Sequence, residues 1–158
     1  ATFGTFGRPG LGYMVVPLCE QLRKIMGTNR TWDVAVVGAG KIGQALSSYS
    51  RFADRGFQIV AVFDSNPKIV GTMVANHQVR PVADMTRIIP LRKIRLAVLS
   101  VPAHVAQDVT DRLVASGITG ILNFAPIRLS VPEGVGVSSV DFSRSLEQLA
   151  LETMVEIN

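Results

Sequence analysis

The chain has 158 residues, 47% of them hydrophobic, and carries a net charge of +4. At this length a single main domain buries about 68–70% of the surface of its unfolded form, so it needs no disulfide or metal. Its single cysteine, Cys19, excludes an intramolecular disulfide and a cysteine-based zinc site and favours a reducing compartment such as the cytoplasm. No apolar run approaches the roughly 20 residues that span a bilayer, so we expect no membrane partner.

The basic excess lies in the first thirty residues. Four basic side chains stand there against one acidic side chain: Arg8, Arg23, Lys24 and Arg30 against Glu20. The rest of the chain has 12 basic and 11 acidic residues. Such an excess is compatible with a nucleic-acid partner, but it is more often an ordinary solvated surface.

The N-terminal segment combines glycines with aromatic residues. Residues 2–13 contain four glycines and one Arg-Pro pair, a composition typical of a hairpin or a wing-like loop. Pro17 suits the first turn of a helix that ends at Gly27. Because the chain begins at Ala1 rather than Met, within this apparent loop, we expect a further segment upstream.

From residue 32 onward, strand-like and helix-like patterns alternate. Strands are expected at 34–37, 59–63, 79–82, 96–101, 120–124 and 135–140, and helices at 42–52, 84–89 and 103–116. The strands are largely continuous runs of Val, Ile and Leu, which is typical of a parallel sheet covered on both faces. We therefore predict a doubly wound α/β domain of the Rossmann type.

A glycine motif lies between the first strand and the first helix: Gly38-Ala39-Gly40-Lys41-Ile42-Gly43. In dinucleotide-binding folds the first glycine permits a tight turn, the second leaves room for a pyrophosphate, and the third lets helix and strand pack closely. The helix N-terminus then offers backbone N–H groups to the phosphates. The motif therefore predicts a dinucleotide site at this turn.

Asp64 indicates which dinucleotide binds. It lies 21 positions after Gly43, at the end of the second strand, where a carboxylate accepts hydrogen bonds from the adenosine ribose. Because a 2′-phosphate would meet this negative charge, NAD(H) is favoured over NADP(H). Lys68 nearby weakens that preference.

Further candidate ligands follow two later strands. Ser100-Val101-Pro102-Ala103 ends one and Asn123-Phe124-Ala125-Pro126 ends the next, both at the carboxyl edge where such sheets bind ligands. For Asn123 two roles stay open, a contact with the nicotinamide or ribose and the cap of a turn. From residue type alone, Asp141-Phe142 is explained by capping of the last helix.

No catalytic group stands out. His77 sits in a polar loop, and His104 lies near the ligand edge but is more typical of a surface histidine in a first helical turn. Tyr49 has no Lys four residues later, so a short-chain reductase pair is unsupported. A nucleotide site without evident chemistry suggests sensing. The alternatives are a small NAD-dependent oxidoreductase that uses His104 or Tyr49, and a CoA-binding module.

The last segment, residues 143–157, is helical in pattern and strongly apolar on one side. Packing on its own sheet and packing on a second copy of the chain both stay open. The side chains of this stripe are Leu146, Leu149, Ala150, Thr153, Met154 and Ile157, with Leu151 and Val155 beside them.

The motifs also fit one family pattern. The wing-like residues 3–13 and the glycine motif occur together with Ala45-Leu46, Tyr49, Phe63-Asp64, Val101-Pro102, Ala106-Gln107, Asn123 to Pro126 and Val140-Asp141-Phe142. Over essentially the whole chain this resembles the Rex family of redox-sensing transcriptional repressors. The family usually has Asn or Arg where Lys41 stands.

The resemblance implies a non-enzymatic homodimer that binds operator DNA when NAD⁺ is high and releases it when NADH binds. It implies that the C-terminal helix is exchanged between subunits, that Phe142 enters the partner's nicotinamide pocket, and that Asp141 and Tyr49 form a polar switch near it. Arg8 becomes the DNA-binding candidate of the wing, and the recognition helix would precede Ala1. The expected division is 1–31 (wing remnant, helix and linker), 32–141 (NAD(H) domain) and 142–158 (dimerisation helix).

Overall fold

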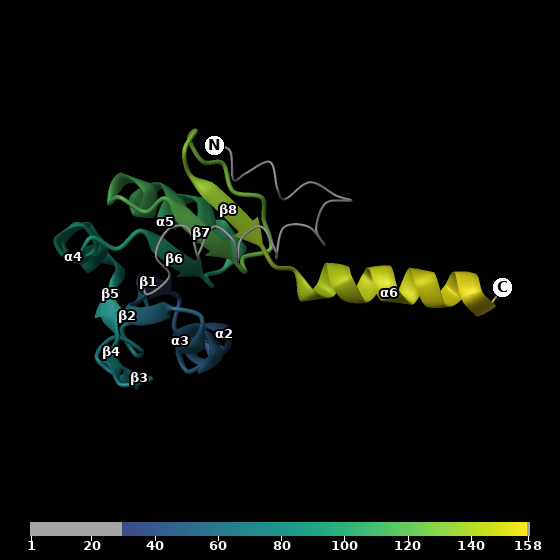
Figure 1. The fold of residues 1–158 in the computed structure, drawn as a ribbon, viewed down its shortest axis with the longest axis horizontal. Helices are drawn as coiled ribbons and strands as arrows, with labels where there is room; N and C mark the ends of the chain where they lie inside the picture. The colour runs from purple at the N-terminus through teal and green to yellow at the C-terminus, as the bar shows by residue number, and fades with distance from the viewer. Residues whose placement is uncertain (1–29, 158) are drawn as a thin grey trace.

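The computed structural model describes residues 30–157 (Figure 1). The wing-like loop of residues 2–13, the helix expected between Pro17 and Gly27, and Arg8 lie outside the described residues. The first described strand begins at Trp32 and the last helix begins at Phe142.

Six parallel strands form the central sheet, in the order β5-β2-β1-β6-β7-β8. After β5 the chain crosses back to the far side of β1, which gives the doubly wound arrangement. The predicted Rossmann-type α/β fold is therefore confirmed. The strands are β1 (Trp32–Val37), β2 (Phe57–Asp64), β5 (Arg80–Pro81), β6 (Leu96–Leu99), β7 (Gly120–Asn123) and β8 (Gly136–Ser139).

Helices cover both faces of this sheet. They are α2 (Lys41–Ser47), α3 (Arg51–Asp54), α4 (Met85–Arg92) and α5 (Ala103–Ala115), with a short 3₁₀ turn at Val82–Asp84. The last helix, α6 (Phe142–Ile157), is not part of these layers. Strand side chains alternate between the faces, so Ala35 and Val37 join the core under α4 and α5, whereas Val34 and Val36 join Leu46 of α2 on the other face. The larger core, under α4 and α5, contains the fully buried Phe63, Met85, Ile89, Leu99 and Leu113.

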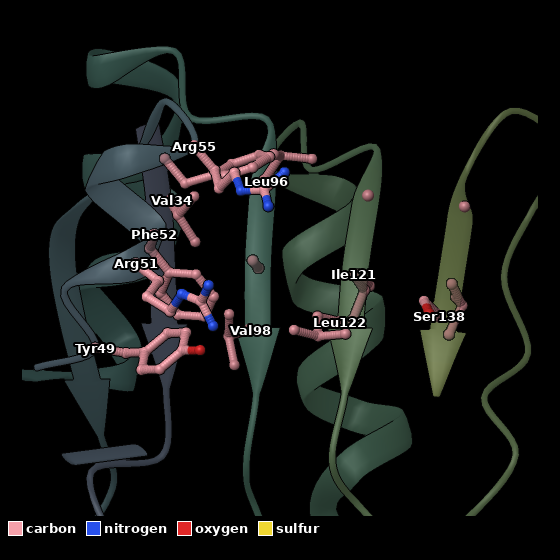
Figure 2. Close-up of a pocket in the computed structure, with 15 residues that line it drawn as sticks. Val34, Tyr49, Arg51, Phe52, Arg55, Leu96, Val98, Ile121, Leu122 and Ser138 are labelled. Carbon is pink, nitrogen blue, oxygen red and sulfur yellow. The ribbon is translucent and has the colours of Figure 1, made fainter. Parts of the chain in front are cut away.

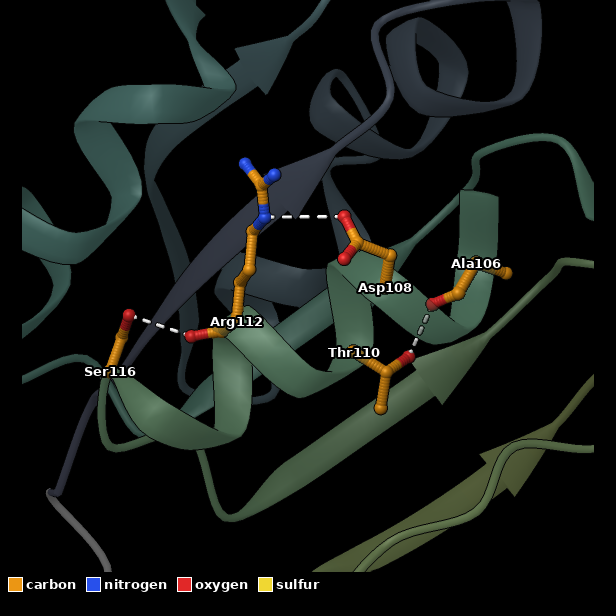
Figure 3. Close-up of polar contacts among 5 residues, drawn as sticks. All are labelled: Ala106, Asp108, Thr110, Arg112 and Ser116. Atoms are coloured by element: carbon orange, nitrogen blue, oxygen red, sulfur yellow. Dashed lines mark hydrogen bonds and ion pairs between the residues drawn. The ribbon is translucent and has the colours of Figure 1, made fainter. Parts of the chain in front are cut away.

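Helix α5 satisfies its buried hydroxyl within its own turns (Figure 3). Thr110 is fully buried, and its Oγ1 donates to the Ala106 carbonyl at 2.7 Å. Ser116 Oγ donates in the same way to the Arg112 carbonyl at 2.8 Å, just beyond the last helical residue. Because each hydroxyl has a partner one turn back, the polar groups of α5 cost the core no unpaired donor.

The predicted helix at 42–52 is wrong in its length, because the structure divides it into α2 and α3. The break falls at residues 48–50, where two serines flank Tyr49. Serine hydroxyls compete with the helical backbone for hydrogen bonds, and Ser47 Oγ already donates to the Gly43 carbonyl at 2.7 Å. Tyr49 therefore lies between two short helices and not within one.

The segment between β2 and β5 also differs from the prediction. It contains an unpredicted antiparallel hairpin, β3 (Met73–Val74) and β4 (His77–Gln78). Its two turn residues, Ala75 and Asn76, both have positive φ, which is the backbone of the tight turns that suit hairpin twist. The strand predicted at 79–82 shortens to Arg80–Pro81, since the chain turns into the 3₁₀ helix at Val82.

Helix α6 extends away from the sheet (Figure 1). Every residue from Phe142 to Glu156 is exposed, including the apolar Leu146 (67%), Leu151 (65%) and Val155 (77%). A helix with this much exposed apolar surface is unstable in water unless it is covered. Within residues 30–157, no helix is both long and apolar enough to cross a membrane.

We expect Leu113→Ala to lower the free energy of unfolding by about 2–5 kcal/mol, because it leaves a cavity in the core between α5 and the sheet. Urea denaturation measures this change. Leu91→Ala is the matched control, since Leu91 is 74% exposed on α4. An equal loss in both variants would contradict the core assignment.

Candidate nucleotide site at the carboxyl edge

Strand register gathers the predicted site residues at one edge of the sheet. Val37 is level with Phe63 on one side and with Leu99 on the other, and Leu99 is level with Asn123. The segments that follow these strands therefore begin side by side: the glycine motif after β1, Asp64 at the end of β2, Ser100 to Pro102 after β6, and Phe124 to Pro126 after β7. This is the edge at which open α/β sheets bind ligands.

The three glycines have three different structural roles. Gly38 has φ +99°, and a Cβ there would collide with the Ser100 carbonyl. A Cβ on Gly43 would overlap the Gly38 carbonyl oxygen, so this helix turn and the loop touch backbone to backbone. At Gly40, by contrast, a Cβ would meet nothing within 4 Å. The space above Gly40 is open, at the N-cap of α2, where a phosphate group would lie.

Asp64 lies at the carboxyl edge of the sheet and also forms a hydrogen bond with the glycine loop. Its Oδ2 accepts a hydrogen bond from the Ala39 N–H at 2.7 Å, and its Oδ1 accepts one from the Asn66 N–H at 2.8 Å. The side chain is half-buried. Because an ionised carboxylate has further lone pairs, these two bonds leave acceptor capacity for a ribose hydroxyl.

Ser100, expected at the carboxyl edge, has a structural role that the sequence did not predict. Its Oγ donates to the Gly38 carbonyl at 2.8 Å, and its backbone N–H donates to the Val37 carbonyl at 2.9 Å. It thus fixes the turn between the first two glycines from the neighbouring strand. The sequence feature that indicates this role is the position of Ser100 directly after β6, the strand that pairs with β1.

Lys41, Ile42 and Lys68 have exposed side chains and follow the strands that end at this edge. Lys41 is the first residue of α2, and Ile42 is 45% exposed on the same turn. The Lys68 backbone N–H donates to Asn66 Oδ1 at 3.0 Å, so a turn carries Lys68 close after Asp64. Both cations are therefore available to an anionic ligand at this edge.

Of the two roles open for Asn123, the structure shows the turn cap. Its side chain is fully buried, and its Oδ1 accepts a hydrogen bond from the Ala125 N–H at 2.9 Å. Its Nδ2 donates to the carbonyls of Ala125 (3.2 Å) and Ile127 (3.0 Å). The amide is thus committed to shaping the loop, which presents Phe124 and the exposed Pro126 in its place.

Asp141 and Phe142 stand at the start of α6. Asp141 Oδ1 accepts a hydrogen bond from the Arg144 N–H at 3.2 Å, as expected for a helix cap. The Phe142 ring lies 6.1 Å from the ring of Phe124 in the same chain, yet Phe142 remains 64% exposed. Phe142 is thus near the carboxyl edge and mostly uncovered.

The remaining candidates divide between the edge and its surroundings. Val101 is half-buried and Pro102 exposed at the start of α5, where Pro102 is the N-cap residue. His104 is exposed in the first turn of α5, and His77 lies in the β3–β4 hairpin. Within residues 30–157, no three His, Cys, Asp or Glu side chains gather to hold a metal ion.

A separate apolar pocket lies on the face of the sheet, with a volume of about 770 Å³ (Figure 2). It covers Val34 of β1 and the first three residues of β6, β7 and β8, and it shares no residue with the glycine motif, so it is not the nucleotide site. Tyr49, Arg51 and Phe52 line it beside Leu96 and Leu122. Tyr49 therefore lies on this pocket, with its ring 4.9 Å from that of Phe52.

We expect Gly43→Ala to lower the free energy of unfolding by about 3 kcal/mol or more, because backbone atoms cannot make room for its Cβ. Gly40→Ala should change it by less than about 1 kcal/mol, since its Cβ enters open space at an ordinary φ of −74°. Thermal denaturation of the two variants distinguishes the glycine roles. A similar loss in both would contradict them.

Known proteins are similar to this chain in sequence. The family described as "CoA binding domain" matches residues 29–127. A redox-sensing transcriptional repressor Rex from Roseiflexus sp. (strain RS-1) is 43% identical over 99% of this chain and 71% of its own length. The Rex protein of Carboxydothermus hydrogenoformans is 44% identical over 94% of this chain and 72% of its own length.

Solved structures agree with these relatives. A crystal structure of RSP, a Rex-family repressor, in complex with NAD⁺ and operator DNA has a TM-score of 0.81 at 37% identity, over 96% of this chain and 70% of that one. The UDP-D-quinovosamine 4-dehydrogenase of Vibrio fischeri has a TM-score of 0.51 at 19% identity, over 60% of this chain and 78% of that one, a likeness of fold alone. The chain belongs to the Rex family of redox-sensing transcriptional repressors, and residues 29–127 belong to the domain family described as "CoA binding domain".

Proposed function

We propose that this chain is an NADH/NAD⁺-sensing transcriptional repressor that acts as a homodimer on operator DNA. The observation that carries this proposal is the arrangement of the carboxyl edge. Gly40 leaves open space there at the N-terminus of α2, and Asp64 accepts a hydrogen bond from the adjacent Ala39 N–H. Relatives named redox-sensing repressors, and the RSP complex with NAD⁺ and operator DNA, support it. We assign residues 32–141 to NAD(H) binding, residues 142–158 to dimerisation, and residues 1–31 to the DNA-binding side.

The adenine half of the dinucleotide would be held by the glycine loop and Asp64. The first backbone N–H groups of α2 and the positive end of its dipole favour a pyrophosphate above Gly40. Lys41, on the same turn, adds a positive charge. Asp64 would accept hydrogen bonds from the ribose hydroxyls, and its charge would oppose a phosphate on that ribose.

The nicotinamide half would lie toward Phe124, Pro126 and the start of α6. In the dimer we propose that the exchanged helix places Phe142 of the partner subunit in this region. A neutral dihydronicotinamide tolerates burial against a phenyl ring, whereas the cationic ring of NAD⁺ pays a desolvation cost there. NADH would therefore favour the closed dimer, and closure would release the operator.

The apolar pocket on the sheet face would receive the exchanged helix. Helix α6 carries an exposed apolar stripe, and the pocket presents apolar strand side chains, among them Leu96, Val98 and Leu122. Arg51 and Arg55 line the pocket, and α6 carries the acidic Glu147, Glu152 and Glu156, so the charges are complementary. Covering both surfaces in one step supports dimerisation by exchange.

Sensing requires no catalytic group. His104 is exposed in the first turn of α5, and within residues 30–157 no side-chain hydrogen bond orients it as an acid or base. We therefore expect no turnover of NADH. CoA is the second candidate ligand because of the domain-family match. The Asp64 carboxylate disfavours it, since CoA carries a phosphate on its adenosine ribose.

We expect calorimetry to find NADH bound more tightly than NADPH by about tenfold or more, because the extra phosphate would face Asp64. CoA should bind no better than NADPH. Tighter binding of CoA than of NADH would favour the CoA module instead. No binding of NADH would overturn the proposal.

Gly40→Ala is the control for the position of the ligand. It retains the fold and should lose most of the affinity for NADH, because its Cβ occupies the space assigned to the pyrophosphate. An unchanged affinity would place the dinucleotide elsewhere.

We expect Phe142→Ala to reduce the preference for NADH over NAD⁺ by about tenfold, as for the lost burial of one aromatic ring. Its stability as a monomer should not change, since Phe142 is 64% exposed. Titration of both dinucleotides measures the ratio. Met73→Ala, which removes an equally exposed apolar side chain from β3, is the matched control. Unchanged selectivity in Phe142→Ala would count against the exchanged-helix arrangement.

A further inference from the structure

We propose that the NAD(H) domain itself contacts the phosphate backbone of duplex DNA, through a cationic patch at the amino edge of its sheet. The patch consists of four side chains, named here the amino-edge cations: Arg30, Arg92, Lys93 and Arg95. The inference rests on the proposed repressor function, because that function brings DNA to the molecule. It adds a second DNA-binding surface that lies outside residues 1–29.

The fold places these four residues at one edge. Strands β1 and β6 are neighbours, with Val34 level with Leu96, so the segments that lead into them begin side by side. Arg95 directly precedes β6, and Arg30 lies two residues before β1. Arg92 is the last residue of α4, and Lys93 ends that helix with a left-handed φ of 54°. The edge is opposite to the one that carries the glycine motif.

The amino-edge cations are exposed and form no ion pair among the described residues. The ion pairs among residues 30–157 join Arg87 to Asp84 and Arg112 to Asp108, and neither includes an amino-edge cation. The acidic residues at this edge include the half-buried Asp33 of β1, the exposed Asp54 at the end of α3 and the exposed Glu133 before β8. The four amino-edge cations and Arg55 outnumber these three acids, which leaves the edge with a positive field.

Two of the cations are held in place without losing their charge. The Arg30 guanidinium lies 4.8 Å from the ring centre of Trp32, and Arg92 Nη1 donates to the Val60 carbonyl at 2.8 Å. Both side chains are therefore partly ordered before a ligand arrives, which lowers the entropy cost of binding. Arg55, at the same edge, lines the sheet-face pocket and is assigned to the helix exchange.

Duplex DNA is the partner that the chain connectivity favours. Residues 1–29, which we assign to the DNA-binding side, join the described fold at Arg30 itself. They add Arg8, Arg23 and Lys24 to the basic excess of that side. Arg and Lys at such an edge bind phosphates without reading base sequence, so they would add affinity and orientation but no specificity.

The test uses the whole chain and a fluorescent duplex of about 25 base pairs of mixed sequence, with affinity followed by anisotropy over a range of KCl concentrations. The edge variant combines Lys93→Asn, which suits a left-handed residue, with Arg95→Gln. The control combines Arg80→Gln with Arg128→Gln, two exposed arginines outside the patch, and removes the same charge. NADH affinity is measured on all samples.

We expect the slope of log affinity against log salt to fall by about 2 in the edge variant, with affinity about tenfold weaker near 0.1 M salt. The control should retain the wild-type slope. Equal slopes in the edge variant and the wild type, or equal falls in both variants, would overturn the amino-edge contact. So would a wild-type chain that binds no duplex. The NADH measurement reports on the proposed function separately, because the amino edge is remote from the glycine motif.

Discussion

Backbone contact between the glycine loop and strand β6 is the constraint on which the functional edge depends. The Ser100 carbonyl leaves no room for a side chain at Gly38, and the Gly38 carbonyl leaves none at Gly43. Ser100 Oγ adjoins both positions from the neighbouring strand. This contact directs the N-terminus of α2 along the carboxyl edge. It also brings the Ala39 N–H to Asp64, so the acidic residue and the helix terminus form one rigid unit.

Much of this edge could be predicted from the sequence because its determinants are local. Glycine spacing, the acid at the end of β2 and the apolar strand runs each specify their own segment, and parallel register then aligns them. The role of Asn123 could not be predicted, because its hydrogen bonds depend on the path of the loop to Ile127. The break at Tyr49 and the hairpin at Ala75 and Asn76 depend on local backbone preferences. These preferences are weak, so the surrounding sequence pattern, helical in one case and irregular in the other, conceals them from prediction.

Two apolar surfaces of the chain lack a partner within residues 30–157. The loop from β7 to β8 contains no helix, so the half of the sheet beside α3 keeps an open apolar face, while α6 leaves the domain with its own apolar stripe exposed. The stripe of α6 could cover the apolar sheet face, and the sheet face could cover the stripe. The proposed exchange of α6 would also place Phe142 next to a nicotinamide site, which would couple dimer closure to the redox state of the ligand.

A crystal structure of the chain with NADH would test this arrangement directly. We expect the pyrophosphate above Gly40, the adenosine ribose within hydrogen-bonding distance of Asp64, and the nicotinamide beside the partner's Phe142. A dinucleotide bound in the sheet-face pocket would contradict it. So would a bound dimer in which Phe142 still packs on Phe124 of its own chain.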